Sequence, residues 1–454
     1  MSARASISGF ALLVIAGLQV VLLTRLLHVD PFFDEGVYLV STDALRHGGE
    51  LGRDVFASQP PAFYDLLRVL SHVFPFSLGG MRLAIVATSL FAIPGAFLAG
   101  RALVGPVAGV AACALLVIAP PFPLWGARIF ADTPALALCS LAVGVAAIGA
   151  SEVAGAVLAL AILTKLSAVT VAPTVLVLLV WTAPRLRRVI GAVAGAATVL
   201  VVFLVVHRHG LGGLWNDGFS YHESAAGASA VSLPNGHELA SFFNTRTPFF
   251  WLLVLGLAGT VVAPRRMLAV WLWPIAAALF VLTHKPLHEN HLLTLPFAFA
   301  LAGGIGLGAG LRRLPRRART VAAACCTLAL AAGYVQQWHN LARARTPVDP
   351  DVVAAAHLVQ RLAPRNGLVA SDEPYVAFLA GHRVPPDLVD TAGLRFRTGY
   401  LTPRSVERTI TEDEVEVVVA GRAFLQQPEL MRWIRSHGRL AARFGTIGLY
   451  RMTR

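Results

Sequence analysis

The first residues of the chain that could do chemistry are two adjacent carboxylates, Asp34 and Glu35, in the segment Asp30-Pro31-Phe32-Phe33-Asp34-Glu35-Gly36. Successive side chains on a helix point about 100° apart, so one carboxylate can face a cavity while the other makes a structural contact. Carboxylates that border an apolar stretch cost desolvation unless something uses them. They are interpreted either as catalytic groups or as acids that stabilise a helix N-terminus through its dipole.

More polar residues follow in the same segment, where Arg53-Asp54 precedes Gln59-Pro60-Pro61-Ala62-Phe63-Tyr64. The paired prolines stiffen the entry to a helix, and Pro61 suits its first turn. Arg53 and Asp54 either serve a site or form a surface pair. Farther along, Asp132 stands where an apolar run begins, as a site carboxylate or as a plain helix-start acid.

Only two of the 38 basic residues are lysines, Lys165 and Lys285. Lys165 interrupts a long apolar stretch, and an ionisable group at such depth usually faces a bundle interior or a wet cavity. A lysine there can hold an anionic group such as a lipid phosphate. The alternatives are a buried pair with a carboxylate such as Glu152 or Asp132 for Lys165, and interfacial snorkelling for Lys285.

Two histidines, His288 and His291, lie three residues apart beside Lys285 and share one face if the segment is helical. Together with Glu289 the two histidines could ligate a metal, but nothing in the sequence fixes a third ligand beside the two histidines. No cofactor motif is present. Whether a divalent cation binds stays open. It would be held by Asp34 and Asp132 or by His288 and His291.

The composition indicates a membrane protein with many passes. Hydrophobic residues make up 56% of the 454 residues and charged residues 14%, against about 25% charged in soluble domains. The formal net charge is +13, but the basic residues cluster between apolar runs, which is typical of cytoplasmic loops and not of nucleic-acid binding. The four cysteines all lie in apolar runs without metal spacing, as buried small residues do.

A helix crosses about 30 Å of hydrocarbon with about 20 apolar residues. Ten runs of about that size are present, and a short run, Val153–Thr164, covers roughly 18 Å at 1.5 Å per residue. The ten runs are Ser6–Thr24, Leu83–Gly100, Ala102–Ala127, Thr133–Ser151, Leu166–Pro184, Val189–Val206, Thr247–Pro264, Met267–Thr283, Leu292–Leu311 and Thr320–Ala342.

Arginine clusters set the predicted orientation, because basic residues favour cytoplasmic loops. With the clusters at residues 185–188, 265–266 and 312–319 inside, the chain makes about eleven passes, N-terminus in and C-terminus out. Loops 28–80, 121–134, 207–247 and 284–291 then lie outside, as does the chain after about residue 343. All the candidate site residues fall on this outer side.

Two regions outside the spans have their own patterns. In the first outer loop, one helical stripe joins Phe63, Leu66, Leu67, Leu70 and Phe74, which predicts a helix in the membrane interface or packed on the protein. Residues 346–454 form a predicted α/β domain that supports the site or binds the acceptor, after a transmembrane domain over 1–345. Its expected helices are Asp351–Leu362, Tyr375–Ala380 and Pro428–Ser436, and its expected strands are Gly367–Ala370, Val415–Ala420 and Ile447–Arg451.

The order and common sidedness of these motifs resemble the GT-C glycosyltransferases. The most similar group is the bacterial protein-mannosyltransferase-like and aminoarabinose-transferase-like branch, which is similar to glycosyltransferase family 39. The motifs that this chain has in common with it are the acidic pair, the Arg-Asp, Pro-Pro, Asp-x-Pro and Thr-Lys pairs, and the His-rich loop. The resemblance covers residues 1–340 and loosely the C-terminal domain, which is short and has no recognisable carbohydrate-binding module. It implies an inverting transfer of a hexosyl or pentosyl group from a polyprenyl phosphate to a hydroxyl on a glycan, lipid or protein. The expected location is the outer face of a bacterial cytoplasmic membrane.

The resemblance assigns roles to the candidate residues. Asp34 would be the catalytic base, while Glu35 and Asp132 orient the acceptor or hold a divalent ion. The donor phosphate would be bound by Lys165, Lys285, His288 and His291. Acceptor contact or loop positioning falls to Arg53, Asp54, Gln59 and Tyr64. The competing interpretations are a transporter or flippase for a lipid-linked glycan, and a structural subunit of the cell envelope.

The orientation predicts the outcome of reporter fusions. A reporter active only outside the cytoplasm should be active after Arg454 and silent near Arg316, because the two positions lie on opposite sides. The reverse pattern would refute the orientation and the sidedness of every candidate residue.

Overall fold

The computed structural model describes residues 3–181, 185–228 and 233–453. The chain forms two compact units, each assembled from three segments. The helical unit comprises Met1–Leu27, Arg82–Val205 and Ser232–Arg345. The α/β unit comprises His28–Met81, Val206–Val231 and Thr346–Arg454, so the first outer loop belongs to the same unit as the C-terminal region.

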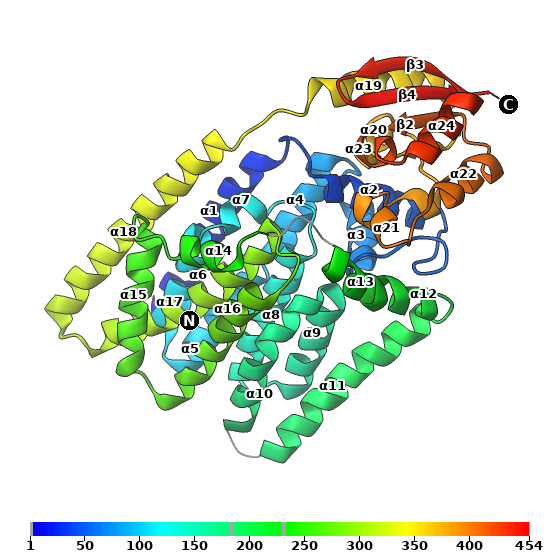
Figure 1. Ribbon diagram of the computed structural model, residues 1–454. Helices are drawn as coiled ribbons and strands as arrows, with labels where there is room; N and C mark the ends of the chain where they lie inside the picture. The colour runs from blue at the N-terminus through cyan, green and yellow to red at the C-terminus, as the bar shows by residue number, and fades with distance from the viewer. Residues whose placement is uncertain (1–2, 182–184, 229–232, 454) are drawn as a thin grey trace. The chain divides into compact units, whose positions relative to one another are not determined.

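Every run expected to span the membrane contains an apolar helix (Figure 1). Among the described residues, five helical segments are long and apolar enough to cross, and six shorter apolar helices accompany them, so eleven passes stays a prediction. Residues 182–184, which end one expected run, lie outside the described residues. The apolar helices are α1 Ala3–Leu23, α4 Leu78–Ser89, α5 Ala92–Leu103, α6 Pro106–Ile118, α8 Asp132–Ala147, α9 Ser151–Thr164, α10 Ala172–Trp181, α11 Arg185–Val206, α15 Pro248–Val261, α16 Leu272–Thr283, α17 Thr294–Arg313 and α18 Arg316–Arg343.

Short elements connect these helices. They are α7 Phe122–Trp125, α14 Asn235–Phe242 and the 3-10 helices η1 Thr24–Leu26, η2 Leu166–Val171, η4 Arg265–Trp271 and η5 Glu289–Leu293. Two of them, η2 and η4, lead directly into α10 and α16, so that each pair forms one apolar helical segment.

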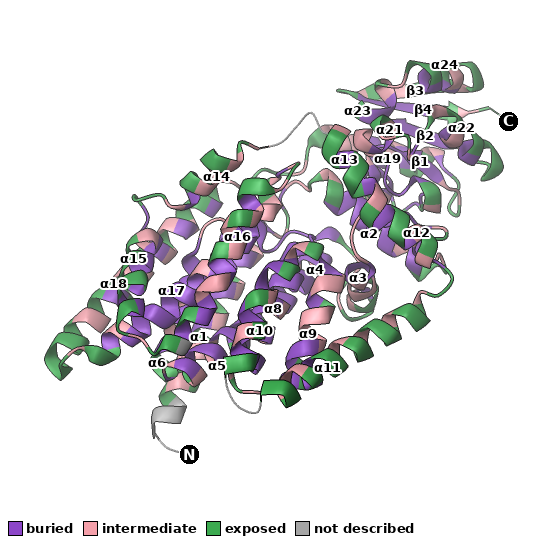
Figure 2. Ribbon diagram, turned by 60° about the horizontal axis from the view of Figure 1, so that its bottom comes forward, coloured by how far each residue is buried: buried purple, intermediate pink, exposed green. Residues whose placement is uncertain are grey.

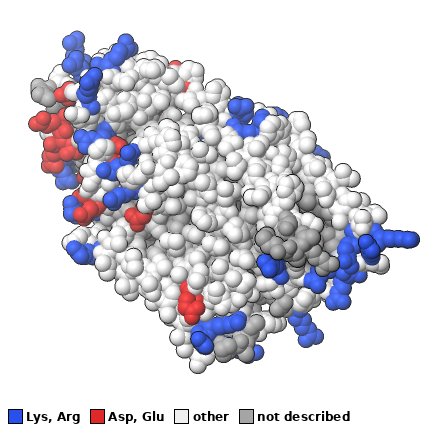
Figure 3. Space-filling view, turned by 180° about the vertical axis from the view of Figure 1, so that it is seen from behind, with Lys and Arg blue, Asp and Glu red and all other residues white. Residues whose placement is uncertain are grey.

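Helix α17 is buried over most of its length, and it packs on α15 and α6 (Figure 2). Small residues allow this approach: a Cβ on Gly256 of α15 would lie 2.2 Å from the carbonyl oxygen of Gly303. Such small-residue contacts are typical of helix pairs in membranes, where close backbone packing replaces the hydrophobic driving force. By contrast, α11 and α18 expose most of their apolar residues. Figure 3 shows a wide surface with few charged side chains, as contact with hydrocarbon requires.

The α/β unit carries a four-stranded sheet in the order β1-β2-β4-β3, and three of its strands are labelled in Figure 1. Strand β1 is parallel to β2, while β4 is antiparallel to both β2 and β3, with Val418 opposite Tyr450. The strands are β1 Val369–Ser371, β2 Val417–Ala420, β3 Gly438–Phe444 and β4 Ile447–Met452. The helices are α2 Phe33–Arg46, α3 Pro61–Val73, α12 Leu211–Trp215, η3 Asn216–Ser220, α13 Tyr221–Ala228, α19 Pro350–Leu362, α20 Pro374–Leu379, η6 Pro386–Leu388, α21 Gly393–Arg397, α22 Pro403–Glu412, α23 Arg422–Leu425 and α24 Pro428–His437.

Each helix and strand expected after residue 346 has a counterpart in the structure, but β3 was not expected. Its residues are all exposed or half-buried, and it carries Arg439 and Arg443. An edge strand pairs on one side only and does not need an apolar run. Its pairing with β4 therefore depends on backbone hydrogen bonds and the tight turn at Gly445, where φ is 53°.

Within the α/β unit, the first outer loop packs closely on the C-terminal region. Gly36 of α2 permits this contact, because a Cβ there would lie 2.8 Å from the backbone nitrogen of Tyr375 in α20. On α3, Phe63 and Leu67 are buried, and the Phe63 ring meets Tyr38 of α2 edge-on at 4.9 Å. This face of the amphipathic helix is therefore packed on protein, which was the second of the two expected environments.

Candidate functional site

A buried ion pair in the helical unit joins two of the candidate residues. The Nζ of Lys165 lies 2.8 Å from Oδ2 of Asp132, and both side chains are almost fully buried. The same oxygen accepts a hydrogen bond of 2.9 Å from the side-chain amide of Asn290. Within the part of the chain that the structure describes, Oδ1 of Asp132 has no hydrogen-bond partner. The second oxygen can therefore accept a hydrogen bond from a hydroxyl group or a water molecule.

Breaks in the helices bring these side chains together. Asp132 is the first residue of α8, whereas Lys165 follows the end of α9 in an extended conformation before η2 begins. A lysine at this break can direct its ammonium toward the start of α8, and its backbone N–H still bonds to the carbonyl of Ala161 at 2.9 Å. The interruption seen in the sequence is thus a helix end with a pairing role, one of the alternatives left open for Lys165.

The histidines lie in the loop that leads into α17, around η5. Nδ1 of His291 accepts a hydrogen bond of 3.3 Å from the backbone N–H of His288, and their rings are 5.6 Å apart. Burial lowers the pKa of His288 and outweighs the opposing effect of Glu289, while the nearby charge of Lys165 lowers it further. His288 is therefore mainly neutral at pH 7 and offers a hydrogen bond but no full charge.

Lys285 and a metal find less support in this loop. Lys285 is exposed, so interfacial snorkelling accounts for it. Among the described residues, no group of three or more histidine, cysteine, aspartate or glutamate side chains is placed to hold a metal ion. A divalent cation therefore stays a prediction from the sequence.

The two adjacent carboxylates divide their tasks as their angular separation predicts. Glu35 is fully buried and accepts a hydrogen bond of 3.1 Å from the backbone N–H of Phe32, which is the return half of a capping box. Asp34 is exposed in the first turn of α2. Burial raises the pKa of Tyr221, and the negative charges of Asp390 and Asp34 raise it further against the effect of Arg395. Asp34 is thus the accessible carboxylate, with a tyrosine hydroxyl nearby that stays protonated.

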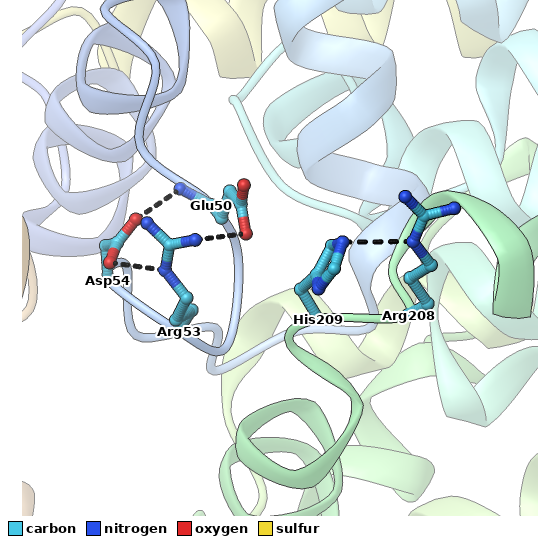
Figure 4. Close-up of polar contacts among 5 residues, drawn as sticks. All are labelled: Glu50, Arg53, Asp54, Arg208 and His209. Carbon is cyan, nitrogen blue, oxygen red and sulfur yellow. Dashed lines mark hydrogen bonds and ion pairs between the residues drawn. The ribbon is translucent and has the colours of Figure 1, made fainter.

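The remaining candidates of the first outer loop have structural contacts. Arg53 pairs with Glu50 at 3.0 Å and with Asp54 at 3.1 Å, on an exposed turn (Figure 4). In a second loop drawn there, Arg208 donates to His209. Tyr64 is fully buried beside Phe63, with its hydroxyl 3.4 Å from that of Ser58, and Gln59 is half-buried. These contacts suit loop positioning.

Some residues of these sites were not found from the sequence. Asn290 stands in the histidine-rich segment, but an amide gives no chemical signal comparable to that of the neighbouring histidines. Tyr221 and Asp217 lie in the loop before α15 without a motif around them. Only the fold brings Asn290 to Asp132, across 158 positions of the sequence.

Comparison with solved structures defines the class of fold. A structure of ArnT from Cupriavidus metallidurans in the apo state matches with a TM-score of 0.72 at 14% identity, covering 99% of this chain and 98% of that one. The same enzyme bound to undecaprenyl phosphate matches at 0.68 and 16%, with the same coverage. The archaeal oligosaccharyltransferase AglB from Archaeoglobus fulgidus, in complex with an inhibitory peptide and a dolichol-phosphate, matches at 0.62 and 12%, covering 100% of this chain and 75% of that one.

The chain therefore has the fold of the GT-C membrane glycosyltransferases, and the resemblance seen in the sequence is confirmed. Residues 58–208 also match the family model described as dolichyl-phosphate-mannose-protein mannosyltransferase. This segment includes Asp132 and Lys165. No curated protein matches the chain by sequence.

The buried pair predicts a double-mutant cycle in thermal stability. Removing one partner leaves an uncompensated buried charge, so Lys165→Met and Asp132→Asn should each cost about 3–5 kcal/mol. The double variant should lose less than the sum, by a coupling of roughly 0.5–3 kcal/mol. The measurement is thermal unfolding of the purified protein in detergent, with the exposed Lys285→Met as the matched control. Additive losses would contradict the pair.

Proposed function

We propose that the chain is an inverting glycosyltransferase that moves a sugar from a polyprenyl phosphate to an acceptor hydroxyl. The observation that carries the proposal is the buried Lys165–Asp132–Asn290 cluster within a GT-C fold. ArnT and AglB, which share the fold, have been solved with undecaprenyl phosphate and with a dolichol-phosphate. The reaction takes place at the outer face of a bacterial cytoplasmic membrane, in keeping with the orientation predicted from the arginine clusters.

In this mechanism, the acceptor hydroxyl attacks the anomeric carbon while the bond to the lipid phosphate breaks, in one step with inversion. Asp34 takes the proton of the attacking hydroxyl as general base. Lys165 supplies positive charge to the departing phosphate. Asp132 holds Lys165 through Oδ2 and keeps Oδ1 for a substrate hydroxyl, while Asn290 fixes the carboxylate in place. The pentose or hexose is selected by contacts outside this set.

The role of Asp34 predicts a loss of turnover without a loss of folding. Asp34→Asn keeps the shape of the side chain but removes the base, and general bases contribute about 10²–10⁴-fold. Turnover of a labelled polyprenyl-phospho-sugar should therefore fall at least about 100-fold. Glu429→Gln, at an exposed first-turn position of α24, is the control for loss of a helix-start charge. Near-normal turnover of Asp34→Asn would contradict the role of Asp34 as the general base.

A donor-phosphate role for Lys165 is separable from its pairing role. If Lys165 contacts phosphate, Lys165→Met should weaken binding of undecaprenyl phosphate by about 10- to 100-fold, as expected for a charge-assisted contact. The decisive protein is the double variant Lys165→Met/Asp132→Asn, in which the buried charge imbalance is gone. Binding that returns to the normal level in the double variant would mean that Lys165 only neutralises Asp132.

A transporter or flippase for a lipid-linked glycan would bind the same phosphate without breaking a bond. Release of free polyprenyl phosphate from the labelled donor therefore distinguishes the transferase from both a flippase and a structural subunit.

A further inference from the structure

A second site lies wholly within the α/β unit, and of the residues assigned to the transfer reaction only Arg53 and Asp54 line it. A pocket of about 260 Å³ is lined by the turn at residues 52–56, by Asp217 of η3 and by residues 387–409 of the C-terminal region. This volume is just below the ~300–1,000 Å³ of pockets for drug-sized ligands, so it suits one small polar group. The pocket is thus too small for a lipid chain or a folded partner.

A buried arginine forms one wall of this pocket. Arg395 is 6% exposed, and its guanidinium lies 3.9 Å from the centre of the Phe56 ring. Its two Nη groups donate to the backbone carbonyls of Asp387, Asp390 and Tyr400. Among the described residues, its Nε has no hydrogen-bond partner. The guanidinium is therefore fixed in place with one donor left unused.

A hydrogen-bond acceptor, Asp217, lines the same pocket. Asp217 is buried, and its Oδ2 accepts a hydrogen bond of 3.0 Å from the backbone N–H of Ala57. Burial raises the pKa of Asp217 to about 6, against the effects of the Ala57 bond and of Arg395. Asp217 is thus mainly ionised at neutral pH, and its carboxylate can accept a hydrogen bond from a hydroxyl group.

The charges of the lining favour a neutral ligand. Three arginines and three aspartates line the pocket: Arg53, Arg395, Arg408, Asp54, Asp217 and Asp387. Arg53 already pairs with Glu50 and Asp54, and Arg408 approaches Glu412 at 4.0 Å. The carboxylates would repel an anion, and the arginines would repel a cation. The lining offers neither kind of ion a surplus of opposite charge. A ligand with several hydroxyls, which both donate and accept, fits this mixture.

The rest of the lining agrees with a sugar. Ser405 and Thr409 add hydroxyls, and Tyr400 adds a half-buried aromatic ring. Tyrosine combines an apolar face with a polar tip, which suits the alternating faces of a sugar ring. Because the ring of Tyr221 lies 5.2 Å from those of Tyr400 and Phe56, the aromatic part of the wall is held by its own packing.

We propose that this pocket binds one neutral sugar residue and that the acceptor of the enzyme is therefore a glycan. The binding site stands on the pocket itself, whereas the identity of the acceptor rests on the proposed transferase function. A glycan acceptor would be retained by a sugar of its own chain while another of its hydroxyls reacts.

The test is saturation-transfer NMR on the full-length protein in detergent, with methyl hexopyranosides and methyl pentofuranosides as probes. At least one neutral glycoside should bind. Asp217→Asn should weaken its binding about tenfold or more, because a hydrogen bond to a charged acceptor is lost. Arg408→Gln tests the exposed rim and should also weaken binding, while Arg404→Gln, on the same helix but outside the lining, should leave it unchanged. Thermal unfolding of each variant separates lost binding from lost fold.

The outcomes distinguish this inference from the proposed function. Glycoside binding without any turnover would support the pocket and refute the transferase. Turnover with no glycoside binding, or binding that is unaffected in both Asp217→Asn and Arg408→Gln, would refute the assignment of this pocket as a sugar site. Binding of inorganic phosphate or glucuronate in preference to neutral glycosides would overturn the ligand class.

Discussion

A buried ammonium has to be neutralised, and in the helical unit that requirement falls on one carboxylate. Lys165 and Asp132 stand at the ends of two different helices, and each needs the other because neither can reach water freely. The pair explains why α9 stops where it does and why α8 begins with an acid. The pair also holds Asn290, whose side-chain amide donates a hydrogen bond to the same Oδ2 of Asp132. A charged group is therefore already ordered before any substrate arrives, which spares the cost of arranging it during the reaction.

Close helix packing holds this cluster in place. Helix α17 follows directly after the loop with Asn290, and its glycines let α15 approach to backbone contact. In hydrocarbon, such contacts stabilise a bundle through van der Waals packing and not through release of water. A bulkier residue at Gly256 or Gly303 would separate the helices, and it would move the loop that supplies the amide. The small residues of the sequence, which look featureless in composition, thus position the polar ones.

Sequence reasoning located the apolar helices and six of the regular elements after residue 346 because both depend on local patterns, but it missed α22 and the shorter helices η6, α21 and α23. The hydrophobic length of a span and the apolar runs of β2 and β4 are visible in short windows of the chain. It also predicted that Asp34 and Glu35 point in different directions, because the angle between neighbours on a helix is fixed, but it did not predict that Glu35 is the buried one. It did not find Asn290, Arg395 or Asp217, since their importance comes from partners far away in the sequence. Strand β3 was missed for a related reason: an exposed edge strand has no apolar pattern to detect.

The contact between Gly36 and Tyr375 bears on how the protein is made. Helix α2 is synthesised within the first fifty residues, but the surface on which it packs, α20, follows more than three hundred residues later. This contact therefore cannot form until α20 has been synthesised, after all the segments of the helical unit. A chain that ends before α20 would leave this face of α2 without its packing partner.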